Sequence, residues 1–392
     1  MSVFKRIGII SLGEAGNLGD DLILLSVIDS LRRYSGLEEV AFLSHGAWLD
    51  WNGVSASLGT LTRLSRRPSL SETASPGAFL ERFADCDAVI FGGGGLLQDV
   101  HHPLRPYHWM RYIPRGVPVL AVGLGLGPLS SRWISALGDS PECFSSLYVR
   151  DGHSLNLATE IGWHAKRSAD CVSGDLVGRL VTSSADNGCV GLAVRAWPGL
   201  SPRAVAEWVD EVVGSHRCER VLAFVLEARS GSGPDVGFTS EVLRHLRAPN
   251  DMLVYDPSDV PGFVSAMSGC RAAVSMKLHS SAVFGFFGIP VYPILYAPKT
   301  ASLFGMPWRG LEIVKQSLAP QLPADDAQPT EEVILQWLQS ADLAPPEALP
   351  FSNGQRRRLQ ARSLQIWAWR RVARRLGLAR TLIRPERTYS QQ

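Results

Sequence analysis

A lysine and a histidine stand two residues apart just after an apolar stretch. Residues 270–274 predict a buried strand, Lys277 and His279 follow it, and residues 282–287 predict a buried helix. Units of strand, polar turn and helix build parallel sheets, whose chemistry gathers at the carboxyl ends of the strands. Lysine supplies a fixed positive charge, and histidine takes or gives a proton near neutral pH. The pair fits an anion site with a proton-transfer group, and a surface lysine beside a capping histidine fits it equally well.

A third charged residue follows a strand earlier in the same half of the chain. Arg195 comes directly after the apolar residues 190–194, and predicted helices and strands alternate from there to Lys277. This alternation predicts a parallel sheet whose strand ends share one edge. We therefore expect Arg195, Lys277 and His279 to lie at one edge, where they could converge.

The first half of the chain repeats the unit with glycine-rich loops. Residues 13–20 (GEAGNLGD), 92–99 (GGGGLLQD) and 123–128 (GLGLGP) each follow an apolar strand. Glycine lets a ligand or another backbone approach closely, and a helix N-terminus attracts anions. A tight turn explains the first loop about as well. That loop is not GxGxxG, and no acidic residue stands where a dinucleotide would need it, so a dinucleotide fold is not predicted.

The segment after the second glycine-rich loop is rich in polar and aromatic side chains. Residues 101–111 contain three histidines, His102 among them, with arginines and a tyrosine. Such side chains suit a sugar or an anion. The histidines match no metal-ligand spacing, so no metal site is predicted.

Length and composition indicate an ordinary soluble protein with two domains. The chain has 392 residues, of which 45% are hydrophobic and 19% charged, and a net charge of +2 that points to no partner class. Six scattered cysteines without a CxxC pair argue against a zinc site or a disulfide framework and favour a reducing cytoplasm. The apolar residues 7–12 near the start are too few for a signal peptide or a spanning helix.

The pattern of elements predicts an N-terminal α/β domain at residues 1–184 and a second at 185–318. Residues 319–353, rich in proline and alanine, predict a linker, and residues 354–392 predict a basic helical tail. Ten arginines and no acid occur between residues 356 and 384. An apolar stripe runs along the tail at helical spacing: Ile366, Trp369, Val372, Leu376, Ala379 and Ile383.

A basic amphipathic helix of this kind has two common roles. It lies on an anionic membrane surface, or it packs its stripe against a protein and leaves its arginines in water. We slightly favour packing for the part that carries Trp369 and solvent or membrane for the rest. No motif that reads nucleic acid accompanies the helix, so nucleic acid is not an expected partner.

Six sequence blocks in order carry a resemblance to a known family. They lie between residues 7 and 299 and read GNLGDD, GGGGLLQD, GLGLGP, VRDGHS, AVRAW and SMKLHSSAVFGFFGIPVYPILYAPK. Together they resemble the polysaccharide pyruvyl transferase family. The resemblance implies an α/β fold of two doubly wound Rossmann-like domains that face a cleft, as in GT-B glycosyltransferases, with the C-terminal basic amphipathic helix added.

The resemblance also implies an activity. Family members transfer pyruvate from phosphoenolpyruvate (PEP) to two hydroxyls of a sugar, which forms a ketal on exopolysaccharide or cell-surface polysaccharide, without a metal or an organic cofactor. The family's V-x-R arginine falls on Arg195 and its R-x-H motif on Lys277 and His279, which implies that they bind PEP and that the histidine is catalytic. Lysine at 277 keeps the charge of the usual arginine but not its two-pronged hydrogen bonding. A second departure is Asp170–Cys171, where the family commonly has Asp-Pro.

Further substrate-binding residues are expected in both halves. They are Asn17, Asp20, Gly93, Gly94, Asp99, His102, Arg150 and Lys299. Asp20 and Asp99 would bind or deprotonate the sugar, although structural capping explains them better.

The expected partners are PEP, a saccharide or lipid-linked oligosaccharide acceptor and, through the tail, the inner membrane face. The alternatives are a GT-B glycosyltransferase that uses a nucleotide sugar and a non-catalytic family member that binds a glycan or a protein.

Overall fold

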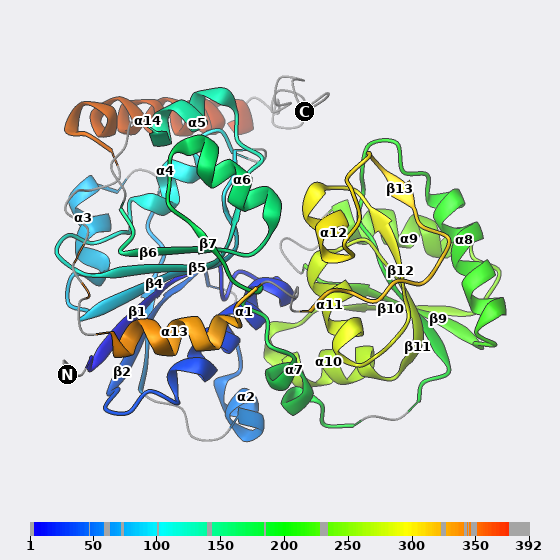
Figure 1. The fold of residues 1–392 in the computed structure, drawn as a ribbon. Helices are drawn as coiled ribbons and strands as arrows, with labels where there is room; N and C mark the ends of the chain where they lie inside the picture. Colours follow the sequence, from blue (N-terminus) through cyan, green and yellow to red (C-terminus); the bar gives the residue numbers. More distant parts are fainter. Residues whose placement is uncertain are drawn as a thin grey trace.

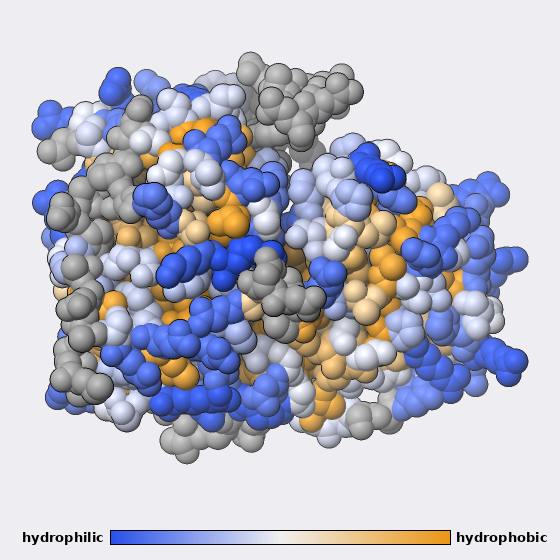
Figure 2. All heavy atoms as spheres, in the orientation of Figure 1, coloured by the Kyte–Doolittle hydropathy of each residue, from blue (hydrophilic) through white to orange (hydrophobic). Residues whose placement is uncertain are grey.

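The computed structural model of the chain consists of two α/β domains that lie side by side (Figure 1). It describes residues 4–46, 48–58, 63–71, 74–99, 102–138, 143–183, 186–227, 234–322, 327–340, 343, 345 and 351–375. In the space-filling view the two domains meet along a furrow (Figure 2). The two-domain architecture implied by the resemblance is therefore the one observed.

The first domain is built on a seven-stranded parallel sheet in the order β3-β2-β1-β4-β5-β6-β7. The strands are β1 (Arg6–Ile10), β2 (Glu39–Ser44), β3 (Arg63–Pro68), β4 (Ala88–Leu97), β5 (Val119–Leu126), β6 (Ser146–Val149) and β7 (Lys166–Arg167). Its helices are α1 (Leu18–Leu31), α2 (Trp51–Leu58), α3 (Pro76–Leu80), η1 (Glu81–Phe83), α4 (Arg105–Met110), α5 (Ser131–Gly138), α6 (Gly152–Ile161) and α7 (Gly174–Leu180). Strands β2 and β5 are buried throughout, as expected for central strands covered by helices on both faces.

The second domain repeats this plan with the strand order β10-β9-β8-β11-β12-β13. The strands are β8 (Cys189–Ala193), β9 (Arg220–Val225), β10 (Asn250–Val254), β11 (Cys270–Ser275), β12 (Val291–Leu295) and the antiparallel β13 (Glu312–Ile313). The helices are α8 (Pro202–Ser215), α9 (Pro234–His245), η2 (Pro257–Asp259), α10 (Val260–Ser268), α11 (Leu278–Phe286) and α12 (Pro298–Leu303). The order reverses between β8 and β11, and ligands bind outside the strand ends at such switch points.

Two glycine-rich segments that we expected as loops are parts of strands. Strand β4 continues through its four glycines to Leu97, and β5 continues to Leu126. A Cβ atom at Gly92 would lie 2.7 Å from the carbonyl oxygen of Val122, so the glycine lets the two strands lie close together. Sequence patterns assign runs of glycine to loops because glycine weakens an isolated strand, whereas these strands are held by their neighbours.

The region 51–76, expected to be a long surface excursion, contains ordered elements. Helix α2 and the edge strand β3 both lie in it, and β3 pairs with β2 over six residues. The sequence of β3, RLSRRP, is polar and half exposed, so it lacks the alternation that identifies a strand. Arginine and proline are typical of edge strands, where they discourage pairing with other chains.

The proline- and alanine-rich stretch contains a helix that the sequence did not predict. Helix α13 (Thr330–Gln339) buries an apolar face that includes Trp337 and packs against α1 of the first domain. The Oγ1 of Thr330 donates to the carbonyl oxygen of Ala169 over 2.8 Å. The chain therefore returns from the second domain and becomes part of the first.

The basic tail forms helix α14 (Asn353–Arg375), which lies across the first domain beside α4 and α5 (Figure 1). The predicted apolar stripe is only partly correct, because Ile366 packs against the core whereas Trp369 is 52% exposed. The helix touches the domain along a narrow line through Leu359 and Ser363, which leaves Trp369 to one side. The end of the stripe, from residue 376 onward, lies outside the described residues. No helix in the described part of the chain has the length and apolar character needed to cross a membrane.

Candidate active site

Two cations lie next to each other at the switch point of the second domain. Strands β8 and β11 pair in parallel, with Ala193 opposite Ser275, so the residues that follow them leave the sheet together. Both side chains reach Asp235 in the first turn of α9. Arg195 Nε lies 3.7 Å from Asp235 Oδ1, and Lys277 Nζ contacts Oδ2.

A third cation joins them from the next strand. Lys299 lies in the first turn of α12, after β12, and its Nζ is 5.8 Å from the ring centre of Tyr296. Burial would raise the pKa of the Tyr296 hydroxyl, but the charges of Lys299, Arg195 and Lys277 lower that pKa overall. All three cations thus act on one buried phenol, and we call Arg195, Lys277, Lys299 and Asp235 the cationic cluster.

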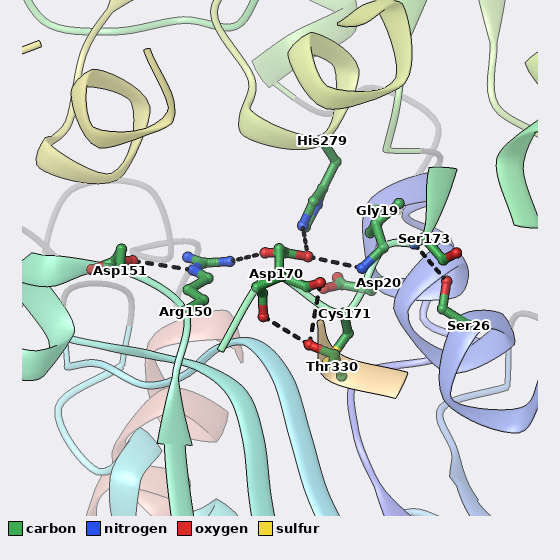
Figure 3. Close-up of polar contacts among 12 residues, drawn as sticks. Gly19, Asp20, Ser26, Arg150, Asp151, Asp170, Cys171, Ser173, His279 and Thr330 are labelled. Carbon is green, nitrogen blue, oxygen red and sulfur yellow. Dashed lines mark hydrogen bonds and ion pairs between the residues drawn. The ribbon is translucent and has the colours of Figure 1, made fainter. Parts of the chain in front are cut away.

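His279 extends from the same strand end toward the opposite domain. It lies in the first turn of α11, and its Nε2 is 3.6 Å from Oδ1 of Asp170 (Figure 3). A Cβ atom at Gly19 would overlap Nδ1 of His279. The second glycine of GNLGDD therefore leaves the space that the imidazole occupies between the domains.

Asp170 belongs to a buried network of charges in the first domain. Arg150 Nη1 donates to Asp170 Oδ2 over 3.0 Å, and Arg150 Nε donates to Asp151 Oδ2 over 3.3 Å (Figure 3). A Cβ atom at Gly125 would lie 2.7 Å from Arg150 Nη2, so this glycine makes room for the guanidinium. We call His279, Asp170, Arg150 and Asp151 the interdomain cluster.

The charge state of Asp170 follows from its partners. Burial would raise its pKa, but the charge and hydrogen bonding of His279 and the charge of Arg150 hold that pKa well below its usual range. Asp170 is therefore an ionised carboxylate facing the imidazole. Such a carboxylate fixes the orientation of the ring and is a good partner for a proton on Nε2.

A cavity of about 240 Å³ lies between the domains, lined by Arg150, Asp151 and Asp170 of the interdomain cluster and by Lys299 of the cationic cluster. Leu278 of the second domain and Thr330 of α13 line it as well. Its volume lies below the roughly 300–1,000 Å³ that is usual for pockets of drug-sized ligands. The cavity suits a small molecule or one end of a larger one.

Several residues expected to bind substrate make structural contacts. Asn17 caps α1, because its Oδ1 accepts from the backbone N–H groups of Gly19 and Asp20. Asp99 accepts from the N–H of Ser130 and, over 2.6 Å, from its hydroxyl. Capping explains Asn17, and the bonds to Ser130 give Asp99 a structural role; the binding of a ligand by either residue stays a prediction.

The other expected residues lie in β4 or near it. Gly93 and Gly94 have φ angles of +78° and +74°, and a Cβ atom at Gly93 would overlap Ile23. A Cβ atom at Gly94 would lie 3.8 Å from Oδ1 of Asp20, which places this glycine beside the start of α1. His102 lies between the end of β4 and the start of α4, and its Nδ1 accepts from the N–H of Leu104.

Sequence reasoning missed three residues of the two clusters. Asp235 follows a segment rich in serine and glycine, where no pattern marks it, and Asp151 enters the sequence analysis only as part of the VRDGHS block. Asp170 was noted only because Cys171 follows it in place of proline. In the structure Cys171 Sγ donates to the carbonyl oxygen of Val122 over 3.5 Å, in space that Gly123 leaves open.

Among the residues described, no group of three histidine, cysteine, aspartate or glutamate side chains is arranged to hold a metal ion. The cations and the imidazole at this edge of the sheet can hold an anion and move a proton beside it.

Comparisons with solved structures place the fold among enzymes of GT-B type. The Staphylococcus aureus MnaA–UDP co-structure is 11% identical, with 96% of this chain and 97% of that chain covered and a TM-score of 0.50. UDP-GlcNAc 2-epimerase from Neisseria meningitidis, bound to UDP-GlcNAc, is 11% identical, with 92% and 100% covered and a TM-score of 0.50. An alpha-glucosyltransferase in complex with UDP and DNA is 9% identical, with 96% and 94% covered and a TM-score of 0.50. At such identities the likeness concerns the fold alone.

A comparison with curated proteins found no match. The family model described as polysaccharide pyruvyl transferase matches residues 17–298, which include both clusters except Lys299. Since this match covers most of the chain, the protein belongs to the polysaccharide pyruvyl transferase family.

Proposed function

We propose that the protein transfers the pyruvyl group of PEP to two hydroxyls of a sugar and so forms a cyclic ketal on an exopolysaccharide or another cell-surface polysaccharide. One observation carries the proposal. Three cations share the strand ends of the second domain, and the imidazole of His279 stands beside them and faces the first domain. Membership of the family supports the same chemistry.

The cationic cluster suits the donor. PEP carries a carboxylate and a phosphate, and both need fixed positive charge. Arg195, Lys277 and Lys299 supply three charges, of which Asp235 balances one. The arginine that is usual in the family at position 277 would bind an anion through two parallel hydrogen bonds, which a lysine cannot form. We propose that the contact with Asp235 orients Lys277 instead, which makes Asp235 a positioning residue.

His279 would act as the proton donor and acceptor. In the proposed reaction it gives a proton to C3 of PEP, and a sugar hydroxyl then attacks the positively charged C2. The hydroxyl proton returns to the imidazole. A second hydroxyl attacks C2, and the bond from C2 to the phosphate oxygen breaks. The proton of this second hydroxyl leaves with the phosphate, so His279 ends the cycle protonated, as it began. Asp170 stays ionised and keeps the ring in place.

The acceptor would enter from the first domain. Arg150 and Asp170 border the cavity there, and Asp20 and Gly94 lie close together at the start of α1. A saccharide or a lipid-linked oligosaccharide fits this assignment. We also propose a cytoplasmic location, in keeping with six scattered cysteines that form no CxxC pair.

The test is the release of phosphate from PEP in the presence of a glycan acceptor. We expect wild-type protein to release phosphate and His279→Ala to lose at least about 100-fold in rate, because general acid–base groups contribute that much or more. The binding of PEP should persist in this variant. If phosphate release is unchanged in His279→Ala, the histidine has no part in the reaction.

The fold also accommodates a glycosyltransferase that uses a nucleotide sugar, since the MnaA and N. meningitidis structures hold UDP and UDP-GlcNAc. In that case Arg195 and Lys277 would hold the diphosphate. A thermal-shift comparison of PEP with UDP-GlcNAc separates the two functions, because only a bound ligand stabilises the fold. Stabilisation by UDP-GlcNAc and not by PEP would replace our proposal with this one.

A further inference from the structure

Positive charge is concentrated on one helix. Helix α14 contains eight arginines and no acid, whereas the whole chain has a net charge of only +2, so the rest of the chain carries a net charge of −6. A charge separated in this way attracts an anionic surface to one face of the molecule. The helix lies on the outside of the first domain (Figure 1).

One side of α14 is fixed to the first domain. Leu359 and Ser363 are buried, and Ser363 Oγ is 3.1 Å from Nε2 of His108 on α4. The Tyr107 hydroxyl donates to Gln360 Oε1 over 3.2 Å, and Arg111 Nη1 donates to the same oxygen. These contacts hold the helix along α4 and determine which of its residues face outward.

Large apolar side chains are exposed on both flanks of this line of contact. Seven large hydrophobic residues are exposed in the described ranges, and three of them lie within six positions of α14. Leu364, Trp367 and Trp369 are 41%, 37% and 52% exposed. The Arg371 guanidinium lies 5.2 Å from the ring centre of Trp367. Exposed aromatic residues interleaved with arginine are typical of surfaces that sit in the headgroup region of a bilayer.

The remaining outward residues add charge around these side chains. Arg357, Arg358 and Arg362 are exposed, and no acidic residue on the helix neutralises them. A long arginine side chain can place its stem against apolar groups and its head among lipid phosphates. Both parts of a lipid surface, its anionic headgroups and its apolar boundary, therefore have matching groups on α14.

We propose that the exposed side of α14 docks the protein on an anionic membrane surface, with its arginines on lipid phosphates and with Leu364, Trp367 and Trp369, which flank the arginines on both sides, at the headgroup boundary. Nucleic acid is the less suitable partner, because its phosphates would bind the arginines while two tryptophans and a leucine stayed exposed to water. Helix α4, on which α14 rests, follows the glycine-rich end of β4. If the proposed function holds, docking keeps the acceptor side close to a lipid-linked sugar.

The experiment is co-sedimentation of the full chain with vesicles of phosphatidylcholine alone or mixed with phosphatidylglycerol, without PEP or sugar. We expect binding only to the mixed vesicles, weakened by salt, with a blue shift of tryptophan fluorescence. The triple variant Arg357→Gln/Arg358→Gln/Arg362→Gln should lose affinity on the order of 100-fold, because each arginine near an anionic surface contributes about fivefold. Leu364→Ala/Trp367→Ala/Trp369→Ala should lose binding and the fluorescence shift.

A matched control changes three solvent-accessible arginines of the second domain. Arg203, Arg220 and Arg244 each lie next to an acid, and their substitution by glutamine should leave vesicle binding unchanged. Circular dichroism and melting temperature verify that every variant is folded. Three results overturn the proposal: no binding of wild type to mixed vesicles, equal binding by the α14 variants, or tighter binding to a DNA duplex than to vesicles.

Discussion

The cationic cluster and the interdomain cluster lie at neighbouring strand ends but differ in charge. The first combines Arg195, Lys277 and Lys299 with a single carboxylate, which leaves a net charge of +2. The second combines one guanidinium with two carboxylates and an imidazole. The first can accept an anion, whereas the second already pairs its only arginine and can instead exchange a proton.

The clusters also differ in where their members come from. Every member of the cationic cluster belongs to the second domain, so its geometry depends on one sheet. In the interdomain cluster, His279 comes from the second domain, and Asp170 with Arg150 comes from the first. The difference suggests a division of work: donor binding depends on one domain, and proton transfer depends on both domains being together.

After His279→Ala, the largest expected effect concerns Asp170. Asp170→Asn removes the charge that faces His279, so we expect the kcat of phosphate release to fall about 100-fold while the affinity for PEP changes little. Steady-state kinetics and calorimetry measure the two quantities separately. A loss of PEP affinity equal to the loss of kcat would show that the two clusters do not work separately.

A smaller effect is expected at Gly19. Gly19→Ala places a methyl group where His279 Nδ1 lies, so the ring must move, and we expect a loss of kcat of about tenfold and about 1–3 kcal/mol of unfolding free energy. Gly178→Ala on α7 is the matched control, since apart from its chain neighbours and the backbone of its own helix nothing lies within 4 Å of the added Cβ. That variant should keep full activity and gain about 0.5–1 kcal/mol from helix propensity. Equal kcat and equal unfolding free energy in the two variants would contradict the placement of the imidazole against Gly19.

Asp235 tests the cationic cluster on its own. Asp235→Ala frees Lys277 and Arg195 from their shared partner, and we expect KM for PEP to rise about tenfold with kcat nearly constant. Asp235→Glu should restore part of the affinity. Tighter binding of PEP by Asp235→Ala would mean that the carboxylate competes with the donor and does not position the cations.

The smallest expected effect is on the pH dependence of stability, in which two carboxylates at the domain interface differ. Asp21 Oδ2 accepts from the Tyr255 hydroxyl over 2.8 Å, and burial raises the pKa of Asp21 to about 8, whereas the charged partners of Asp170 lower its pKa. The folded protein thus keeps a proton on Asp21 that the unfolded chain releases above about pH 4. The contribution of Asp21 to the free energy of unfolding should therefore fall as the pH rises from about 4 to about 8.

Asp21→Asn removes that dependence, because its amide imitates the protonated acid. Denaturant unfolding between pH 5 and 8 measures the slope, which should be flatter in the variant. Asp170 changes stability with pH in the opposite direction. Its contribution to the free energy of unfolding is present above about pH 4 and is lost as the pH falls through the lowered pKa of the folded state. An unchanged slope in Asp21→Asn would show that Asp21 is ionised when folded.

Sequence patterns predicted the parts of this arrangement that depend on strands and their ends. Apolar strands followed by charged residues placed Arg195 and Lys277 at one sheet edge, and the structure brings them together on Asp235. The direction of His279 was not predictable, because it depends on Gly19 and Asp170 far away in sequence. Asp235 was missed for the same reason, since its role arises only when two distant cations reach it.

Calorimetric titration of PEP into wild type, Arg195→Ala and His279→Ala tests the division between the two clusters most directly. We predict that Arg195→Ala loses about 30-fold or more in affinity, the effect of removing a partly buried charge partner, and that His279→Ala stays within about threefold of wild type. Equal affinity in all three proteins, or a loss in His279→Ala as large as in Arg195→Ala, would contradict the account.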